Sequence, residues 1–338
     1  MTGFPEVFAA LVGPPGGRAA AVGAAFDAIL AGEWTPVQVA GLAVSLRLLG
    51  ESPDVIHAAA ASLRRSMIEV PHGLPLVLDT CGTGGDGAGT WNLSTGAALL
   101  VAACGVPVAK HGNRAVSSRS GSADVLEALG VVVTVAADRQ AGILRDVGVA
   151  FLFAPSHHPA MRHGGVARRE LGIRTLFNVL GPLANPARAT HQVLGAYDDA
   201  LRPVLAETLR ALGTAAAWIV RGEDGLDELS PCGPTRVTAL RDGAISELVV
   251  TPEDFGLPRL PPSALLGEGP AENARMIAQV LSGEPHPARD AVVLNAAAGL
   301  VVARGLSPRD ATEQVTRALA DGRASRVLAE LIAATSAA

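Results

Sequence analysis

The chain has 338 residues, of which 49% are apolar, 17% are charged and 3% are aromatic, and its net charge is −5. This length and composition predict a globular protein with room for one large or two ordinary domains. They argue against a general binder of nucleic acid or of membrane surfaces, and no apolar run reaches the ~18 residues of a membrane span.

The first 71 residues are predicted to be helical. Apolar residues recur at helical spacing between Leu30 and Leu49, and Thr35-Pro36 provides an N-cap with proline at the first helical position. Ser52-Pro53 begins another helix. Pro71-His72-Gly73 then interrupts the pattern and predicts a hinge.

Beyond the hinge, strands and helices alternate. The sequence predicts helices at 94–104, 122–129 and 141–147, and strands at 76–78, 106–109, 131–133 and 149–153. This order is typical of a mostly parallel sheet with helices on its faces. Loops that bind substrates should therefore lie at the carboxyl ends of the strands.

The alternation stops between residues 157 and 187, a helical, loop-rich stretch that we expect to return to the N-terminal helices. Strands follow at 192–196 and 215–220, then a hairpin that turns at Asp242-Gly243, and helices from 270 to 336. The fold class expected is α/β, with a small all-helical domain hinged to a larger α/β domain whose mostly parallel central sheet is flanked by helices. The predicted division is residues 1–71, with 157–187, against 72–156 and 188–338.

Two motifs follow predicted strands. Lys110 is the only lysine in the chain and begins the run Lys110-His111-Gly112-Asn113-Arg114; a compact ammonium can enter a crowded anionic site where a guanidinium fork does not fit. Upstream, the glycine-rich segment 82–87 precedes Ser94 and Thr95 at a helix start, where backbone N–H groups can bind an anion. By itself the loop could equally be a turn with an ordinary N-cap, and Lys110 favours the phosphate site.

Six segments, at 82–87, 92–95, 110–118, 120–124, 174–186 and 225–228, together resemble the anthranilate phosphoribosyltransferases of tryptophan biosynthesis. The resemblance extends from the N-terminal helices to the last helices. It implies transfer of the 5-phosphoribosyl group from phosphoribosyl pyrophosphate to the amine of anthranilate, which gives N-(5-phosphoribosyl)anthranilate and pyrophosphate. It also implies magnesium as cofactor and a homodimer formed through the helical domain.

The same resemblance implies roles for particular residues. The expected catalytic residues are Lys110, Asn113 and Arg168, the anthranilate contacts are Gly82, Asn113, His158 and Arg168, and the magnesium ligands are Ser94, Asp227 and Glu228. The expected phosphoribosyl pyrophosphate contacts are Gly82, Thr83, Gly84, Gly85, Asp86, Thr90, Asn92, Leu93, Ser94, Thr95, Lys110, His111, Gly112, Asn113, Arg114, Ala115, Val116, Ser117, Ser118 and Ser122.

The implied transfer reaction is expected to need little acid–base catalysis. Loss of pyrophosphate leaves a ribosyl centre with oxocarbenium character, and an arylamine is already neutral at pH 7, so positioning and electrostatics should dominate. Trp91 replaces the phenylalanine usual in the family, and Gly164-Gly165 stands where bulkier residues are usual. Both departures concern loops rather than the reaction.

Two other functions remain open from the sequence. A nucleic-acid-binding protein of the same fold would be expected to carry basic patches in place of Asp227-Glu228. A pyrimidine nucleoside phosphorylase would carry a different lysine motif. The three cysteines are too scattered for a disulfide or zinc framework, so we expect reduced thiols and a cytoplasmic location, with no nucleic-acid or membrane partner.

Overall fold

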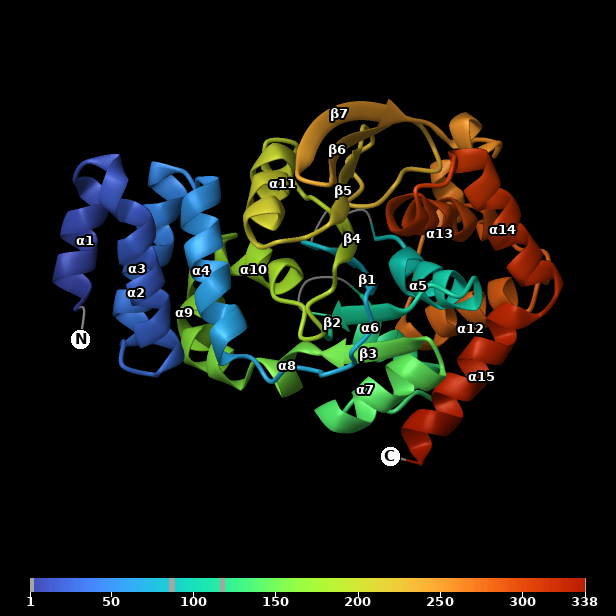
Figure 1. The fold of residues 1–338 in the computed structure, drawn as a ribbon, viewed down its shortest axis with the longest axis horizontal. Helices are drawn as coiled ribbons and strands as arrows, with labels where there is room; N and C mark the ends of the chain where they lie inside the picture. Colours follow the sequence, from blue (N-terminus) through green and yellow to red (C-terminus); the bar gives the residue numbers. More distant parts are fainter. Residues whose placement is uncertain (1–2, 85–88, 116–118, 338) are drawn as a thin grey trace.

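The computed structural model describes residues 3–84, 89–115 and 119–337. At its N-terminal end a group of helices lies beside the rest of the chain (Figure 1). These are α1 (Phe4–Val12), α2 (Arg18–Leu30), α3 (Pro36–Leu49) and α4 (Pro53–Ser66), with a short 3₁₀ turn at Pro15–Gly17. The start of α3 is confirmed: Gln38 donates its backbone N–H to the Thr35 hydroxyl, and the Thr35 N–H is bonded to the Gln38 side chain in return.

The centre of the larger part is a sheet with the strand order β3-β2-β1-β4-β5-β6-β7 in the described residues. Neighbours from β3 to β5 are parallel, and β6 and β7 continue the sheet as an antiparallel hairpin. The predicted turn at Asp242-Gly243 has positive φ at both residues, as such a tight hairpin turn requires. The strands are β1 (Leu78–Gly82), β2 (Val108–Gly112), β3 (Val149–Phe153), β4 (His191–Gly195), β5 (Ala216–Gly222), β6 (Thr235–Arg241) and β7 (Ala244–Val250).

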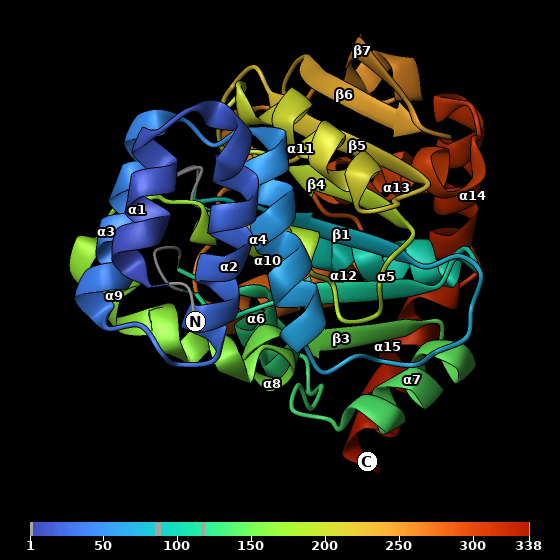
Figure 2. The same ribbon diagram turned by 60° about the vertical axis from the view of Figure 1, so that its left-hand side comes forward.

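Helices cover the sheet, as Figures 1 and 2 show. Helix α13 (Arg289–Arg304), almost wholly buried, packs against α5 (Leu93–Ala103) and β4, while α11 (Leu201–Ala211) packs against β5 and β6. The remaining elements of this part are α6 (Ser122–Ala128), α7 (Ala137–Asp146), α12 (Pro270–Leu281), α14 (Pro308–Ala320), α15 (Arg323–Ser336) and the 3₁₀ turns Pro252–Phe255 and Pro262–Leu265. The expected fold class is confirmed: N-terminal helices beside a mostly parallel sheet flanked by helices.

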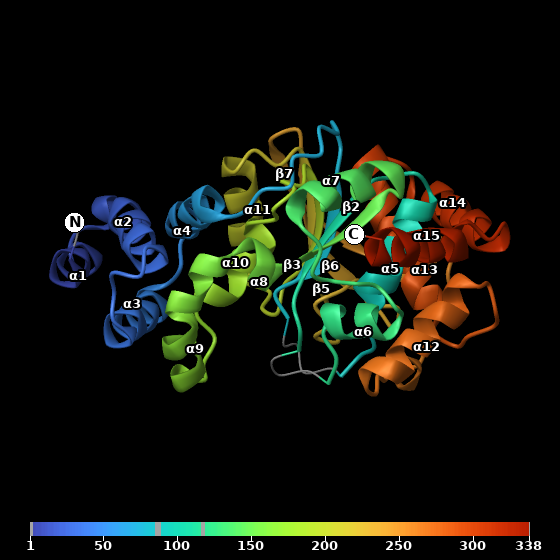
Figure 3. The same cartoon turned by 90° about the horizontal axis from the view of Figure 1, so that it is seen from below.

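The segment after β3 runs toward the N-terminal helices. It contains α8 (Ala154–His157), the 3₁₀ turn Pro159–Gly164, α9 (Gly165–Leu171) and α10 (Phe177–Leu183). Helix α9 packs on α3, and α10 packs on α4. Figure 3 shows α10 between α4 and the sheet, with α9 at the side of the N-terminal helices. The chain that leaves α4 is tied to this segment, because Ile68 N–H donates to the His157 carbonyl over 2.8 Å and Val70 N–H donates to the Pro186 carbonyl over 3.0 Å.

One predicted strand is wrong. Residues 131–133 form no strand, although Val131, Val133 and Val135 are buried and alternate with exposed neighbours. Alternating burial indicates an extended backbone, but a β-strand also needs a neighbouring strand with which it forms backbone hydrogen bonds. Here the Val132 N–H donates instead to the Thr335 hydroxyl of α15.

No single helix of the described residues is both long and apolar enough to cross a membrane. The helices α13 and α14 meet that test only together, across a bend of 118°.

Candidate active site

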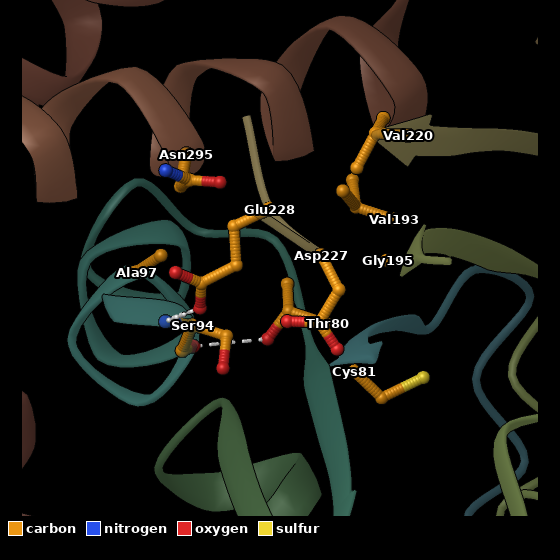
Figure 4. Close-up of a pocket in the computed structure, with 10 residues that line it drawn as sticks. All are labelled: Thr80, Cys81, Ser94, Ala97, Val193, Gly195, Val220, Asp227, Glu228 and Asn295. Carbon is orange, nitrogen blue, oxygen red and sulfur yellow. Dashed lines mark hydrogen bonds between the residues drawn. The ribbon is translucent and has the colours of Figure 1, made fainter. Parts of the chain in front are cut away.

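A pocket lies at the carboxyl ends of the central strands, where β1 and β4 are neighbours although the chain visits β2 and β3 between them. Open α/β sheets bind ligands where the strand order reverses in this way. Figure 4 shows residues from β1, β4, β5, α5, α13 and the loop after β5 around this pocket. Its lining residues are Thr80, Cys81, Ser94, Ala97, Val193, Gly195, Val220, Asp227, Glu228 and Asn295.

The two carboxylates reach the pocket from the loop after β5. Asp227 Oδ2 accepts the backbone N–H of Gly84 over 2.8 Å, and Glu228 Oε1 accepts the backbone N–H of Ser94 over 3.0 Å. Gly195 makes this approach possible, because a Cβ there would lie 1.5 Å from the Asp227 carbonyl oxygen. The glycine motif and the carboxylate pair are therefore joined directly.

Lys110 lies within β2 rather than after it, and its side chain is almost wholly buried. Its ammonium donates to the Thr80 carbonyl over 2.5 Å and to the Ser94 hydroxyl over 3.3 Å. Burial lowers the pKa of Lys110, and the negative charge of Asp79 is the strongest influence that raises it again. The ammonium thus points at the start of α5, beside both carboxylates.

The loop after β2 is shaped by α6. Asp124 accepts the backbone N–H groups of Ala115 and Gly121, each over 2.9 Å, and the Ser122 hydroxyl donates to the Asn113 carbonyl. A Cβ at Gly121 would lie 2.4 Å from the Ala115 nitrogen, so only glycine fits. The Arg114 guanidinium is bonded to Glu127 and Asp124 of α6, which leaves it exposed and turned to that helix.

The other predicted loop residues lie around the same strand ends. Thr83 is fixed through its side chain, which accepts the Tyr197 N–H over 2.9 Å, while Thr90 pairs with Leu266. Asn92 precedes α5 and contacts Asn273 and the Ser120 carbonyl. Leu93 and Thr95, in the first turn of α5, are buried. The predicted contacts that lie outside the described residues are Gly85, Asp86, Val116, Ser117 and Ser118.

Two buried histidines stand side by side next to Lys110. The rings of His111, on β2, and His158, after α8, have centroids 5.1 Å apart. His111 Nδ1 lies 3.0 Å from the Gly181 carbonyl, which can only accept, so Nδ1 carries the proton and Nε2 keeps a lone pair. Burial is the main cause that lowers the pKa of His111 to about 3 and that of His158 to about 4, so both rings are neutral at pH 7.

Arg168 is separate from the phosphate loops. It lies on α9, half-buried, with its guanidinium carbon 5.7 Å from the centre of the Phe177 ring. Burial lowers the pKa of the Arg168 guanidinium below its usual range, and within the described residues no carboxylate forms an ion pair with it. Gly82, in contrast, ends β1 beside Asp227, where a Cβ would lie 2.7 Å from Oδ2.

The donor set fits magnesium. Asp227 and Glu228 carry carboxylate oxygens to the pocket and Ser94 adds a hydroxyl, and magnesium prefers such hard oxygen donors while it keeps water and substrate phosphates in its shell. No cluster of three or more His, Cys, Asp or Glu side chains stands ready to hold a metal in the described residues.

Sequence reasoning assigned no role to Asp79, Asn185 or Asn273, although all three are buried and bonded to the motif strands or loops. A carboxylate directly after the apolar run Leu76-Val77-Leu78 was the available signal for Asp79. The contacts of Asn185 and Asn273 cross 76 and 181 residues of sequence, so no local pattern could reveal them.

Comparisons with known proteins agree with this arrangement. Residues 74–325 match the α/β domain of the glycosyl transferase family, and residues 19–67 match its helical bundle domain. Anthranilate phosphoribosyltransferases from Rhodopseudomonas palustris BisA53 and Methylocella silvestris are 47% and 49% identical, covering 93% and 92% of this chain and 93% and 89% of their own lengths.

Solved structures give the same result. Anthranilate phosphoribosyltransferase from Thermus thermophilus superposes with a TM-score of 0.92 at 43% identity, over 98% of this chain and 99% of that one. The Saccharomyces cerevisiae enzyme, solved in complex with phosphoribosyl pyrophosphate and magnesium, has a TM-score of 0.91 at 30% identity, over 99% and 98%. The chain belongs to the anthranilate phosphoribosyltransferase family.

Proposed function

We propose that this chain transfers the 5-phosphoribosyl group of phosphoribosyl pyrophosphate to the amine of anthranilate, a step of tryptophan biosynthesis, with magnesium as cofactor. The observation that carries the proposal is the meeting of the Lys110 ammonium, the glycine-loop backbone and the Asp227-Glu228 pair at the start of α5. A buried cation and a carboxylate pair at one helix N-terminus suit a polyphosphate and its metal.

In this function Lys110 and the predicted contacts of the glycine loop bind phosphate oxygens of the donor. Ser94, Asp227 and Glu228 hold magnesium, which supplies positive charge to the pyrophosphate leaving group when bound. We propose that the other predicted contacts, so far as the structure describes them, bind the ribose and its phosphates. The protein stabilises the charge that develops as the bond to pyrophosphate breaks.

Anthranilate is proposed to bind between the two histidines and α9. The half-buried guanidinium of Arg168, which has no carboxylate partner within the described residues, can pair with the carboxylate of anthranilate through two parallel hydrogen bonds. Asn113 and His158 complete the contacts, with backbone at Gly82. Because both histidines are neutral at pH 7, the pocket adds no positive charge near the amine.

We also propose the domain division at residues 71–73, with 157–187 moving with the N-terminal helices. Closure of the two domains would bring the amine to the ribosyl carbon and exclude water. Exposed large apolar side chains gather on α1 and α3 and support a homodimer through these helices: Phe8, Val12, Val37, Leu48 and Leu49. The free thiols Cys81, Cys104 and Cys232 agree with the proposed cytoplasmic location.

One assay tests the function. Anthranilate fluorescence should fall with time only when the enzyme, phosphoribosyl pyrophosphate and magnesium are all present. A chain that leaves anthranilate unchanged, yet cleaves a pyrimidine nucleoside with inorganic phosphate, would be a phosphorylase and would overturn the proposal.

A further inference from the structure

The ladder between β1 and β2 ends early. These strands pair at Leu78↔Val108, whereas β1 and β4 pair along their whole length, from Leu78↔His191 to Gly82↔Gly195. The next step of a parallel ladder would set Thr80 opposite Lys110, with the Thr80 carbonyl accepting from His111 N–H and the Ala109 carbonyl accepting from Thr80 N–H. The register of these two described strands ends before that step.

Side chains bond the backbone groups around this step. The Thr80 carbonyl accepts the Lys110 ammonium over 2.5 Å, the His111 N–H donates to Asp79 Oδ1 over 3.1 Å, and the Ala109 carbonyl accepts Asn185 Nδ2 over 2.8 Å. Buried backbone polar groups are nearly always bonded, so these side chains support the backbone of β1 and β2 where their register ends. The backbone groups on either side of Lys110, the Ala109 carbonyl and the His111 N–H, are therefore bonded to Asn185 and Asp79.

Asp79 and Asn185 are locked to each other. Asn185 Nδ2 also donates to Asp79 Oδ2 over 2.8 Å, and its Oδ1 accepts the Ala187 N–H over 2.8 Å, so the amide cannot rotate without losing all three bonds. Asp79 is completely buried and Asn185 nearly so. Burial raises the pKa of Asp79, while the Asn185 bond and the charge of Lys110 oppose that change.

We propose that Asp79 is a positioning residue for phosphoribosyl transfer: its carboxylate, held by Asn185, takes the place of the missing ladder step and fixes the β2 backbone around Lys110. The ammonium then points at Ser94 rather than along the strand. Asp79 acts through Lys110 and touches no substrate. The inference rests on the proposed binding of phosphoribosyl pyrophosphate by Lys110.

The test is a double-mutant cycle on affinity for phosphoribosyl pyrophosphate, measured by calorimetry with magnesium present. Asp79→Asn keeps the shape and the acceptor for His111 N–H, but turns an amide nitrogen toward Asn185 Nδ2. It should weaken binding by about tenfold in the parent and by less than about twofold in a Lys110→Ala background, since residues that act as a unit are not additive.

A second variant and a control keep the test decisive. Asn185→Ala, which keeps the Asp79 side chain and removes the bonds of the amide, should show the same dependence on Lys110 and serves if Asp79→Asn does not fold. Val315→Ala, at a fully buried position of α14, should lower stability without changing affinity.

The outcomes separate the two claims. Parent affinity in both the Asp79→Asn and Asn185→Ala enzymes, or equal losses with and without Lys110, would overturn the positioning role alone. Parent affinity in the Lys110→Ala enzyme would instead overturn the proposed phosphate contact on which it rests.

Discussion

The Lys110 ammonium lies 3.3 Å from the Ser94 hydroxyl, and Ser94 also bonds Glu228 through its backbone N–H. One residue at the start of α5 thus connects the lysine motif of β2 with the carboxylate motif after β5. Its carbonyl accepts the Thr80 hydroxyl over 3.1 Å, which ties the same turn to β1 (Figure 4). The three motifs found in the sequence meet at this turn.

Replacing Lys110 with alanine should abolish useful turnover while the protein stays folded, because the ammonium is the proposed contact for phosphate oxygens. Lys110→Arg should restore little activity, since a planar fork does not fit a site that is almost wholly buried and already bonded to Thr80 and Ser94. Steady-state rates and circular dichroism check both variants. An arginine enzyme with the parent rate would contradict the need for a compact cation.

Most of the fold could be predicted because its signals are local. Thr35 and Pro36 mark the start of α3, and the alternation of strands and helices gives the parallel sheet. The strand predicted at 131–133 failed because burial alternates there without a neighbouring strand. Two strands also end later than predicted, because Asp79 to Gly82 lie inside β1 and Lys110 to Gly112 lie inside β2. Polar residues can continue a strand that tertiary contacts support.

The site was only partly predictable. The family resemblance predicted roles for Lys110, Ser94 and Asp227, and the pocket brings Ser94 and Asp227 together beside the lysine. Nothing local could show that Arg114 turns to Glu127, because that depends on where α6 packs. The bond between Asn185 and Asp79 likewise depends on a chain that leaves the sheet and returns.

Arg168→Ala should raise the Michaelis constant for anthranilate much more than that for phosphoribosyl pyrophosphate. Loss of a charged hydrogen-bonding partner costs about 2 kcal/mol, or roughly a 30-fold change. Steady-state kinetics with each substrate varied in turn measure the two constants. The neighbour Arg169, which is exposed, gives the matched control Arg169→Ala, with both constants expected to stay at parent values. Equal rises for both substrates in the Arg168 enzyme would make that residue part of the scaffold.

The buried histidines predict a loss of stability in acid. The folded pKa of His111, about 3, lies below its unfolded value of 6.5, so the unfolded chain binds the additional proton. The stabilising contribution is complete above pH 6.5 and is lost progressively as the pH falls toward 3. Urea unfolding at pH 7 and at pH 4.5 measures how much the free energy of unfolding decreases in acid. This decrease should be smaller for His111→Gln than for the parent, while His57→Gln should behave as the parent. Identical acid losses in all three proteins would contradict a buried neutral imidazole.

The apolar side chains on α1 and α3 predict the assembly. Leu48 and Val37 are 82% and 81% exposed, more than any other large apolar side chain of the described residues. If they form the homodimer contact, Leu48→Glu should give monomers in sedimentation velocity, because a buried unpaired carboxylate is costly. Val249→Glu, on the exposed β7 hairpin, should have the same sedimentation distribution as the parent. A dimeric Leu48→Glu enzyme would place the contact elsewhere.

Magnesium dependence tests the carboxylate pair. Asp227 and Glu228 lie against the glycine loop and the start of α5, where a bound pyrophosphate would repel both carboxylates unless a cation stood between them. Asp227→Asn combined with Glu228→Gln should leave the fold intact, because amide oxygens still accept the N–H groups of Gly84 and Ser94. The rate should fall to a low level that no longer responds to the metal. The measurement is initial rate against magnesium concentration at fixed phosphoribosyl pyrophosphate, with the exposed Glu253→Gln as control. If the double variant kept the parent's rate and magnesium curve, the pair would serve only to hold the two loops together.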